Sequence, residues 1–211
     1  VKIIETMNQA LAFLQDSSVE ELFRVCIFHY LLEYIHPFYD GNGRLGRFIF
    51  SYGLSNVLTP LTALRISSTI KKNINAYYKA FESCNDERNR GDITPFLIMQ
   101  LNMILNAMQE LIESLLRRYM DWKKYEEIVS RQFDLDNTLY QMFDYLIQAT
   151  LFSENGITMS ELKECFSYSE YKVKKILDRI PVDLLLITKK GKFNYYNIDL
   201  SKLDNEVSTK G

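Results

Sequence analysis

The residues whose types could support chemistry gather in one segment, His36 to Arg47, which has the sequence His-Pro-Phe-Tyr-Asp-Gly-Asn-Gly-Arg-Leu-Gly-Arg. The segment contains one of the two histidines of the chain, three of its eight glycines, an aspartate and two arginines. Packing alone does not require this combination. Gly41-Asn42-Gly43 before a helical pattern predicts a backbone that can point several N–H groups at one anion, aided by the helix dipole. Phosphate is the usual occupant of such a site.

The charged side chains of this segment suit a polyphosphate. Arg44 and Arg47 lie three residues apart, so both guanidinium groups can reach the same ligand from one face of a helix. Asp40 is a suitable Mg²⁺ ligand, because magnesium commonly joins one or two carboxylates to phosphate oxygens. An imidazole exchanges protons near neutral pH, so His36 can accept a proton from a hydroxyl group. Together these residues predict phosphoryl or nucleotidyl transfer to an alcohol.

The segment matches every defined position of the signature His-Pro-Phe-x-Asp-Gly-Asn-Gly-Arg-x-x-Arg, and in this it resembles the Fic family. Most characterised members of that family transfer AMP from ATP to a hydroxyl group of a target protein. The likeness continues through Tyr77-Tyr78, Asn85 and the stretch Gly91-Asp92-Ile93-Thr94-Pro95-Phe96, and it covers roughly residues 1 to 115. The second glycine of the loop is typical of AMP-transferring members, whereas the Doc-type kinases have lysine there.

The resemblance implies a role for each matching residue. His36 would deprotonate the Ser, Thr or Tyr hydroxyl of the target, Asp40 would hold Mg²⁺, and Phe38 would anchor the loop in the core. The nucleotide-binding residues that it implies are Gly41, Asn42, Gly43, Arg44, Gly46 and Arg47 around the phosphates of ATP, and Tyr77, Tyr78 and Asn85 on the adenosine side. The chemistry could also run differently within the family, as removal of AMP or as transfer of another nucleotidyl or phosphoryl group.

Two features of the family pattern are expected outside this segment. Residues 1 to 20 contain no pair of strands, so we expect the β-hairpin that docks the target upstream of Val1, where the chain starts without a methionine. The family's inhibitory motif, Ser/Thr-x-x-x-Glu-Gly/Asn, fits the spacing of Thr150 to Asn155. Because that stretch lies in a different part of the chain, we expect an inhibitory helix upstream instead.

Hydrophobic periodicity predicts a mainly α protein. We expect a helix at 4–15, a second that starts at a capping box of Ser18 with Glu21 and ends at His36, and a third from Gly43 to Val57, which Thr59-Pro60 ends. A fourth helix is expected from Ile70 to Cys84, with Ser67 or Ser68 as its cap, and a fifth from Thr94 to about Ser130. Both helices that flank the loop look buried. Further helices are expected at 137–152, 158–166 and 171–180, the last two capped by Thr158 with Glu161 and by Ser167 with Glu170, before a strand, turn and strand at 184–198.

These elements predict a Fic-like helical bundle at 1–115, a connecting helix at 116–133, a winged-helix-like domain of three helices plus a β-hairpin at 134–200, and a flexible tail at 201–211. The net charge of −2 excludes a general affinity for polyanions. Three widely separated cysteines favour reduced thiols and a cytoplasmic location. No apolar stretch reaches the roughly 18 residues of a membrane span, so no membrane partner is expected.

A second class of function remains open, a DNA-binding regulator in which the Fic-like core is a sensor or scaffold. Basic residues on the last predicted helix and at the turn of the hairpin could meet DNA phosphates: Lys172, Lys174, Lys175, Arg179, Lys189, Lys190 and Lys192. A solvated surface or a dimer contact explains them at least as well as DNA binding, because Glu170, Asp178 and Asp183 dilute their positive charge. A homo-oligomer is a further expectation, because the apolar stripe from Leu101 to Leu115 could pair helices as well as fill a core. His29 is expected to be a packed core histidine.

Overall fold

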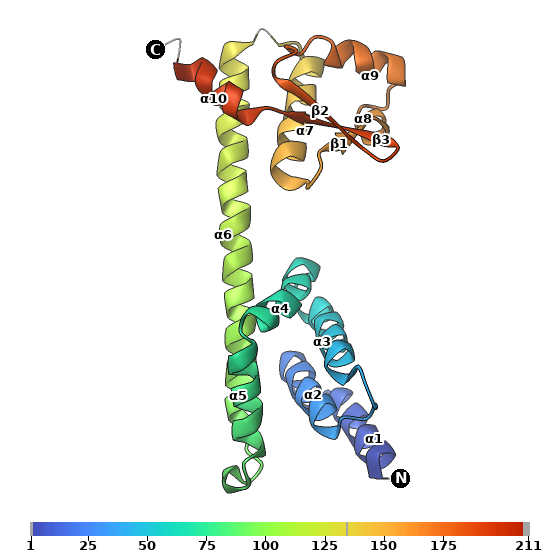
Figure 1. Cartoon of the computed structure of the whole chain (residues 1–211), viewed down its shortest axis with the longest axis vertical. Helices are drawn as coiled ribbons and strands as arrows, with labels where there is room; N and C mark the ends of the chain where they lie inside the picture. The colour runs from blue at the N-terminus through green and yellow to red at the C-terminus, as the bar shows by residue number, and fades with distance from the viewer. Residues whose placement is uncertain (1, 134, 209–211) are drawn as a thin grey trace. The chain divides into compact units, whose positions relative to one another are not determined.

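The computed structural model describes residues 2–133 and 135–208, and the described part is mainly helical, as predicted. The chain divides into two compact units, Val1–Glu113 and Ser114–Gly211. Unit 1 contains α1 (Lys2–Leu14), α2 (Glu21–Ile35), α3 (Asn42–Val57), α4 (Pro60–Lys72), α5 (Ile74–Asn85), the short 3₁₀ helix η1 (Glu87–Asn89) and the first part of α6 (Thr94–Gln132) (Figure 1). Each unit has a hydrophobic core of its own.

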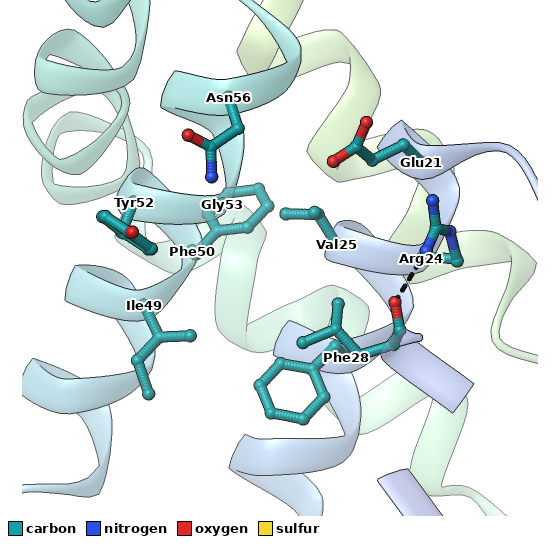
Figure 2. Close-up of a pocket in the computed structure, with 10 residues that line it drawn as sticks. Glu21, Arg24, Val25, Phe28, Ile49, Phe50, Tyr52, Gly53 and Asn56 are labelled. Atoms are coloured by element: carbon teal, nitrogen blue, oxygen red, sulfur yellow. Dashed lines mark hydrogen bonds between the residues drawn. The ribbon is translucent and has the colours of Figure 1, made fainter. Parts of the chain in front are cut away.

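The core of unit 1 forms where α2 and α3 pack against each other and against α4, α5 and the start of α6. Phe50 and Leu54 of α3 and Phe96 of α6 are almost completely buried. Gly53 lets the two helices approach closely, because a Cβ atom there would lie 2.9 Å from Cγ1 of Val25. Figure 2 shows Val25 of α2 directly opposite Gly53 of α3. The loop between these helices is therefore mounted on two elements that are fixed by packing.

The expected burial of both flanking helices is only partly correct. α2 buries most of its middle, including Cys26 and Phe28. α3, by contrast, exposes Phe48 and Tyr52, which are 67% and 64% accessible. These two residues lie four positions apart on the same side of α3, so this side of the helix is exposed. The sequence pattern does not reveal this face, because α3 is rich in apolar residues on both sides.

Two predicted helix starts in unit 1 have the wrong capping residue. Glu20, not Ser18, caps α2, since its carboxylate accepts hydrogen bonds from the N–H groups of Leu22 and Phe23. The hydroxyl of Ser18 instead donates to Asp16 at 2.7 Å. Thr59 caps α4 with proline at the first turn, so Thr59-Pro60 starts a helix, and Ser67 and Ser68 lie inside it. Proline suits this position because the N–H that it lacks would have no partner in the first turn.

The described part of unit 2 contains the second part of α6, four further helices and a small antiparallel sheet, and three of these helices, α7 to α9, have with the sheet the arrangement of a winged helix. Its elements after α6 are α7 (Asn137–Phe152), β1 (Ile157–Thr158), α8 (Met159–Phe166), α9 (Glu170–Leu177), β2 (Leu185–Lys190), β3 (Phe193–Ile198) and α10 (Leu200–Ser208). The strand order is β1-β3-β2 (Figure 1). The hairpin and the capping box of Thr158 with Glu161 are confirmed. Ser169, not Ser167, caps α9, and Ser167 ends α8 in a left-handed conformation.

Two elements at the edges of unit 2 differ from the expectation. β1 was not predicted, because two residues are too few to show an alternating pattern. The residues expected to form a flexible tail begin with helix α10, whose Leu203 is completely buried in the core of the unit. Leu203, together with Leu200, which packs against the same core, orders this mostly polar segment. Residues 134 and 209–211, which also fall in predicted segments, lie outside the described residues.

No helix in the described part of the chain is long and apolar enough to cross a membrane.

Candidate active site

The loop His36 to Gly41 begins where α2 ends. α2 ends at Ile35, as the following Pro37 predicts, and the N–H of His36 donates to the carbonyl of Leu32 at 3.1 Å. His36 has a left-handed backbone, with φ 50° and ψ 59°, although a residue before proline usually prefers an extended conformation. This conformation costs a non-glycine residue roughly 1 kcal/mol. It turns the chain sharply and leaves the His36 side chain exposed at the edge of the loop.

Asn42 holds the loop in shape. Its side chain is buried, Oδ1 accepts a hydrogen bond from the N–H of Phe38 at 2.9 Å, and Nδ2 donates to the carbonyl of Phe38 at 2.5 Å. Both polar groups of the side chain are thus bonded to the backbone of the loop. The sequence implied a nucleotide-binding role for Asn42, and in the structure its side chain positions the loop.

The N-terminus of α3 has the local geometry that an anion site requires. Gly41 is the residue before the helix, with φ 87°, and no side chain caps the helix there. The first N–H groups of a helix have no partner inside the helix. With no capping side chain to accept from them, the N–H groups that follow Gly41 can bind an anion, and the helix dipole favours a negative charge at this end.

The two arginines fold back over the glycines of the loop. Nη2 of Arg44 lies 3.6 Å from the position that a Cβ atom of Gly41 would take, and Nη1 of Arg47 lies 3.1 Å from the corresponding position at Gly43. At Gly43 the absence of a Cβ atom leaves room for the guanidinium group of Arg47, whereas at Gly41 the positive φ is what favours glycine. Arg44 also pairs with Asp40 at 3.3 Å, but both side chains are more than three-quarters exposed. Such a pair contributes less than about 1 kcal/mol, so a phosphate or a metal ion can displace it.

Neutral groups lie beneath the loop. His29 is 1% exposed, stacks on Phe50 with 4.6 Å between ring centroids, and shares a hydrogen bond of 3.1 Å between its Nε2 and the hydroxyl of Tyr77. Burial is the main cause that lowers the pKa of His29 to about 3, opposed by a hydrogen bond to the Gly46 backbone and assisted by the charge of Arg47. His29 is thus an uncharged core histidine, as predicted.

The aromatic residues expected around the nucleotide are distributed differently. Tyr77 is 3% exposed and belongs to the core, so its ring presents no open face to a ligand, whereas Tyr78 is 56% exposed. Phe38 is 52% exposed, so the expectation that it anchors the loop in the core is wrong. The buried amide of Asn42 holds the backbone of Phe38 instead.

Asn85 lies at a separate concavity of unit 1. Its Oδ1 accepts a hydrogen bond from the hydroxyl of Tyr30 at 2.9 Å. Asn85 lines a pocket of about 350 Å³ with Tyr30 and Tyr34 of α2 and with residues of the α5–α6 connection. Because Tyr34 stands two residues before His36, this pocket opens beside the same helix end that carries the loop.

A further pocket of about 190 Å³ lies between α2 and α3, where Figure 2 shows it. It is lined mainly by apolar side chains, with Arg24 at one side, where Nη1 donates to the carbonyl of Leu14 at 2.9 Å. No residue of the loop lines this pocket. It is a packing defect between the two helices that carry the loop and not a part of the candidate active site.

The residues around the loop fit a magnesium ion only together with a phosphate ligand. The described residues contain no group of three or more His, Cys, Asp or Glu side chains that could hold a metal by themselves. Asp40 is a single, highly exposed carboxylate beside the anion site. This suits Mg²⁺, which keeps several waters and is commonly bound through one or two carboxylates and the phosphates of a substrate.

One acidic residue of the site was missed from the sequence. Glu33 lies one turn before His36 on α2, and its Oε1 is buried without a hydrogen-bond partner in the described structure. A signal was available, because Glu33 is the one charged residue in the otherwise apolar or aromatic stretch Val25 to Ile35, apart from His29. Periodicity alone could not show that its carboxylate turns toward α3.

The geometry defines a class of site, a glycine-rich loop at an uncapped helix N-terminus with two arginines beside its glycines and an exposed histidine at its other end. Residues 2–54 match the model of the Fic/DOC family. The structure is similar to the crystal structure of a Fic family protein from Desulfovibrio desulfuricans G20, with a TM-score of 0.50 and 22% sequence identity over 94% of this chain and 55% of that chain. This likeness shows a Fic-like fold. The chain spans about half the length of that protein.

Proposed function

We propose that the protein is a Mg²⁺-dependent protein adenylyltransferase that transfers AMP from ATP to a Ser, Thr or Tyr hydroxyl of a target protein. One observation carries the proposal: the uncapped N-terminus of α3 has Arg44 and Arg47 folded over its glycines, and His36 stands exposed at the other end of the same loop. These groups supply an anion site, counter-charges and a base within one rigidly mounted segment. The match of residues 2–54 to the Fic/DOC family supports the same chemistry.

The proposed reaction assigns one task to each group. The N–H groups after Gly41 hold the α- and β-phosphates, and the two guanidinium groups hold the β- and γ-phosphates, which fixes the α-phosphorus for in-line attack. The target hydroxyl oxygen forms a bond to the α-phosphorus while the bond to the β-phosphate oxygen breaks. His36 takes the hydroxyl proton, and pyrophosphate leaves. Mg²⁺, when bound to Asp40 and the phosphates, would neutralise part of the charge that develops on the leaving group.

The adenosine end of the nucleotide is proposed to lie toward Tyr78 and the pocket that contains Asn85. Tyr78 is exposed, and Tyr34 offers a second exposed ring beside Asn85. Aromatic rings can stack on a purine base, and the amide of Asn85 can bond to its polar edge. Tyr77 is proposed to support this region from the core without contacting the nucleotide.

The test is transfer of label from ATP to protein in a cell lysate. α-Labelled ATP and Mg²⁺ should label one or more proteins when the native chain is present, and His36→Ala should abolish the labelling while leaving ATP binding largely intact. Labelling from γ-labelled ATP would indicate phosphoryl transfer instead. Release of AMP from a previously modified protein would indicate the reverse reaction. Labelling that is absent, or that is equal with His36→Ala, would refute the proposal.

A second candidate function, DNA binding by unit 2, is favoured by the winged-helix arrangement of its elements. Lys189 and Lys192 are exposed at the hairpin, and Lys175 is exposed on α9. Two other basic residues have partners inside the unit: Lys174 of α9 pairs with Glu170 at 2.6 Å, and Arg179, just after α9, pairs with Asp136 at 2.6 Å. These acidic partners reduce the positive charge of this face, and we rank this function second.

Binding to duplex DNA at increasing salt concentration tests the second candidate. Because affinity that depends on phosphate contacts falls steeply with salt, binding at low salt that is weakened by Lys175→Glu and Lys192→Glu would support it. Lys123→Glu is the matched control, because it makes the same change of charge on the part of α6 that belongs to the same unit. Lack of binding at low salt would exclude DNA as the partner.

A further inference from the structure

Glu33 occupies an unusual environment for a carboxylate. Its Oε1 is buried and has no hydrogen-bond partner in the described structure, although the residue lies on α2 only one turn from the exposed loop. Burial raises the pKa of Glu33, and the positive charges of Arg47 and then His36 oppose this rise without cancelling it. The ionised side chain therefore costs folding stability. A group that destabilises the fold in the middle of a site calls for another explanation than packing.

α3 makes room for this carboxylate. A Cβ atom at Gly46 would lie 2.2 Å from Oε1 of Glu33 and 3.1 Å from its Cδ, so no other residue fits at position 46 while Glu33 stays in place. Gly46 is on the second turn of α3, and the next residue is Arg47. The glycine that the loop sequence places there thus brings the carboxylate of α2 up to the backbone that carries the second arginine.

Arg47 is the cation that this carboxylate faces. The Arg47 side chain is partly buried and folds back along α3 until Nη1 lies 3.1 Å from the Cβ position of Gly43. Within residues 2–133 and 135–204, no carboxylate oxygen lies within 4.0 Å of a nitrogen of the Arg47 guanidinium group, so Arg47 has no ion-pair partner there. Arg47 is the first of the two cations that lower the pKa of Glu33. Two other titratable groups interact electrostatically with Glu33, namely His36 at the end of α2 and Tyr77 on α5.

We propose that Glu33 is a positioning residue, whose buried carboxylate draws the guanidinium group of Arg47 back over the loop and so presents it to the phosphates of the nucleotide. This inference rests on the proposed function. The carboxylate touches no phosphate itself and acts through Arg47. Without it, the Arg47 side chain is free to extend into solvent, and a bound polyphosphate would have to fix it at an additional cost in entropy.

Calorimetric titration of the full chain with ATP, ADP and AMP in the presence of Mg²⁺ tests the inference. Glu33→Gln should lower the affinity for ATP about tenfold, the size expected when two coupled residues are separated. The same substitution in an Arg47→Ala background should cause no further loss, and AMP binding should be unchanged because AMP lacks the outer phosphates. Glu21→Gln, which removes the same charge from the exposed start of α2, should bind ATP as the wild type does.

Stability separates positioning from a structural role. Because the ionised carboxylate is destabilising, Glu33→Gln should raise the melting temperature at neutral pH, and the wild type should lose stability relative to it as pH rises from about 4.5. A residue that mattered only for packing would lower the melting temperature. Gly46→Ala should displace the carboxylate, so it should copy the loss of ATP affinity while lowering stability. Glu33→Ala added to Gly46→Ala should restore stability but not affinity.

The outcomes distinguish the inference from the function on which it rests. Unchanged or tighter ATP binding by Glu33→Gln would overturn the positioning role. Tighter binding would mean that the Glu33 carboxylate only repels the phosphates, because its removal would then raise the affinity. The positioning role would also be overturned if Glu33→Gln lowered the ATP affinity of Arg47→Ala by the same factor as it lowers that of the wild type. If the wild-type chain bound no ATP at all, the proposed function and this inference would both be refuted.

Discussion

Replacing Asn42 by alanine should destabilise the loop His36 to Gly41 and so lower the free energy of unfolding measurably. The substitution removes both hydrogen bonds to Phe38, of 2.9 and 2.5 Å, from a side chain that is 3% exposed. Each bond contributes roughly 1 kcal/mol net. Alanine at the start of α3 offsets about 0.5 kcal/mol through its better helix propensity. The free energy of unfolding should therefore fall by about 1.5 kcal/mol.

Urea unfolding followed by far-ultraviolet circular dichroism measures this loss. Asn102→Ala is the matched control, because Asn102 is an exposed residue of α6 in the same unit, where alanine should leave stability unchanged or raise it slightly. Asn42→Asp is a second variant, which keeps an acceptor for the N–H of Phe38 but sets a negative charge against the Phe38 carbonyl and the anion site. It should weaken ATP binding more than it weakens folding. A loss below about 0.5 kcal/mol for Asn42→Ala, equal to the control, would refute the reasoning.

Three further predictions concern the support beneath the loop. Tyr77→Phe removes the 3.1 Å hydrogen bond to Nε2 of His29 and should lower the free energy of unfolding by about 1 kcal/mol in urea unfolding, with Phe81→Leu as a control for packing alone. Gly53→Ala places a Cβ atom 2.9 Å from Val25 and should cost about 1–3 kcal/mol, which Val25→Ala in the same chain should partly restore. Because burial depresses the pKa of His29 from 6.5 to about 3, its contribution to stability is present above pH 6.5 and is lost as pH falls toward 3. Nuclear magnetic resonance should show its ring neutral well below pH 6.5, and a His29 ring that protonates near that pH would contradict the burial argument.

Long, periodic elements of the fold could be predicted from the sequence. α7 has the predicted bounds, Asn137–Phe152, and α6 extends only slightly past the predicted end. Helix starts were less predictable because several polar residues compete to cap one end. Glu20 and Ser169 lie closer to the first helical turn than Ser18 and Ser167 do, and a cap must reach the second or third N–H of its helix. The sequence shows that a capping residue is present near each helix start, and the packing of the helix that follows determines which of the candidate residues is the cap.

The candidate site could be predicted as a set of residue types but not as an arrangement. Spacing is enough to place Arg44 and Arg47 at one helix end, because a helix has only one geometry. The inner side of the loop depends on contacts between residues far apart in the chain, such as Tyr77 with His29. Phe38 and Glu33 show the same limit: the apolar residue is exposed and the charged one is turned inward. Composition gives no reason for either, because both follow from how Asn42 and Gly46 fix the loop and α3.

The charges of the site are sorted between its two sides. Beneath the loop His29 is held neutral, the pKa of the Tyr77 hydroxyl is raised by its burial and by Glu33, and the amide of Asn42 carries no charge. Arg44 and the free N–H groups at the start of α3 are on the outer side, and Arg47 is partly buried. An anion that approaches from solvent would therefore meet positive charge first, while Oε1 of Glu33 is buried. The proposed phosphate site would lose this separation if His29 were protonated or if Glu33 were exposed, so the groups under the loop would contribute to anion binding together with the groups that touch the ligand.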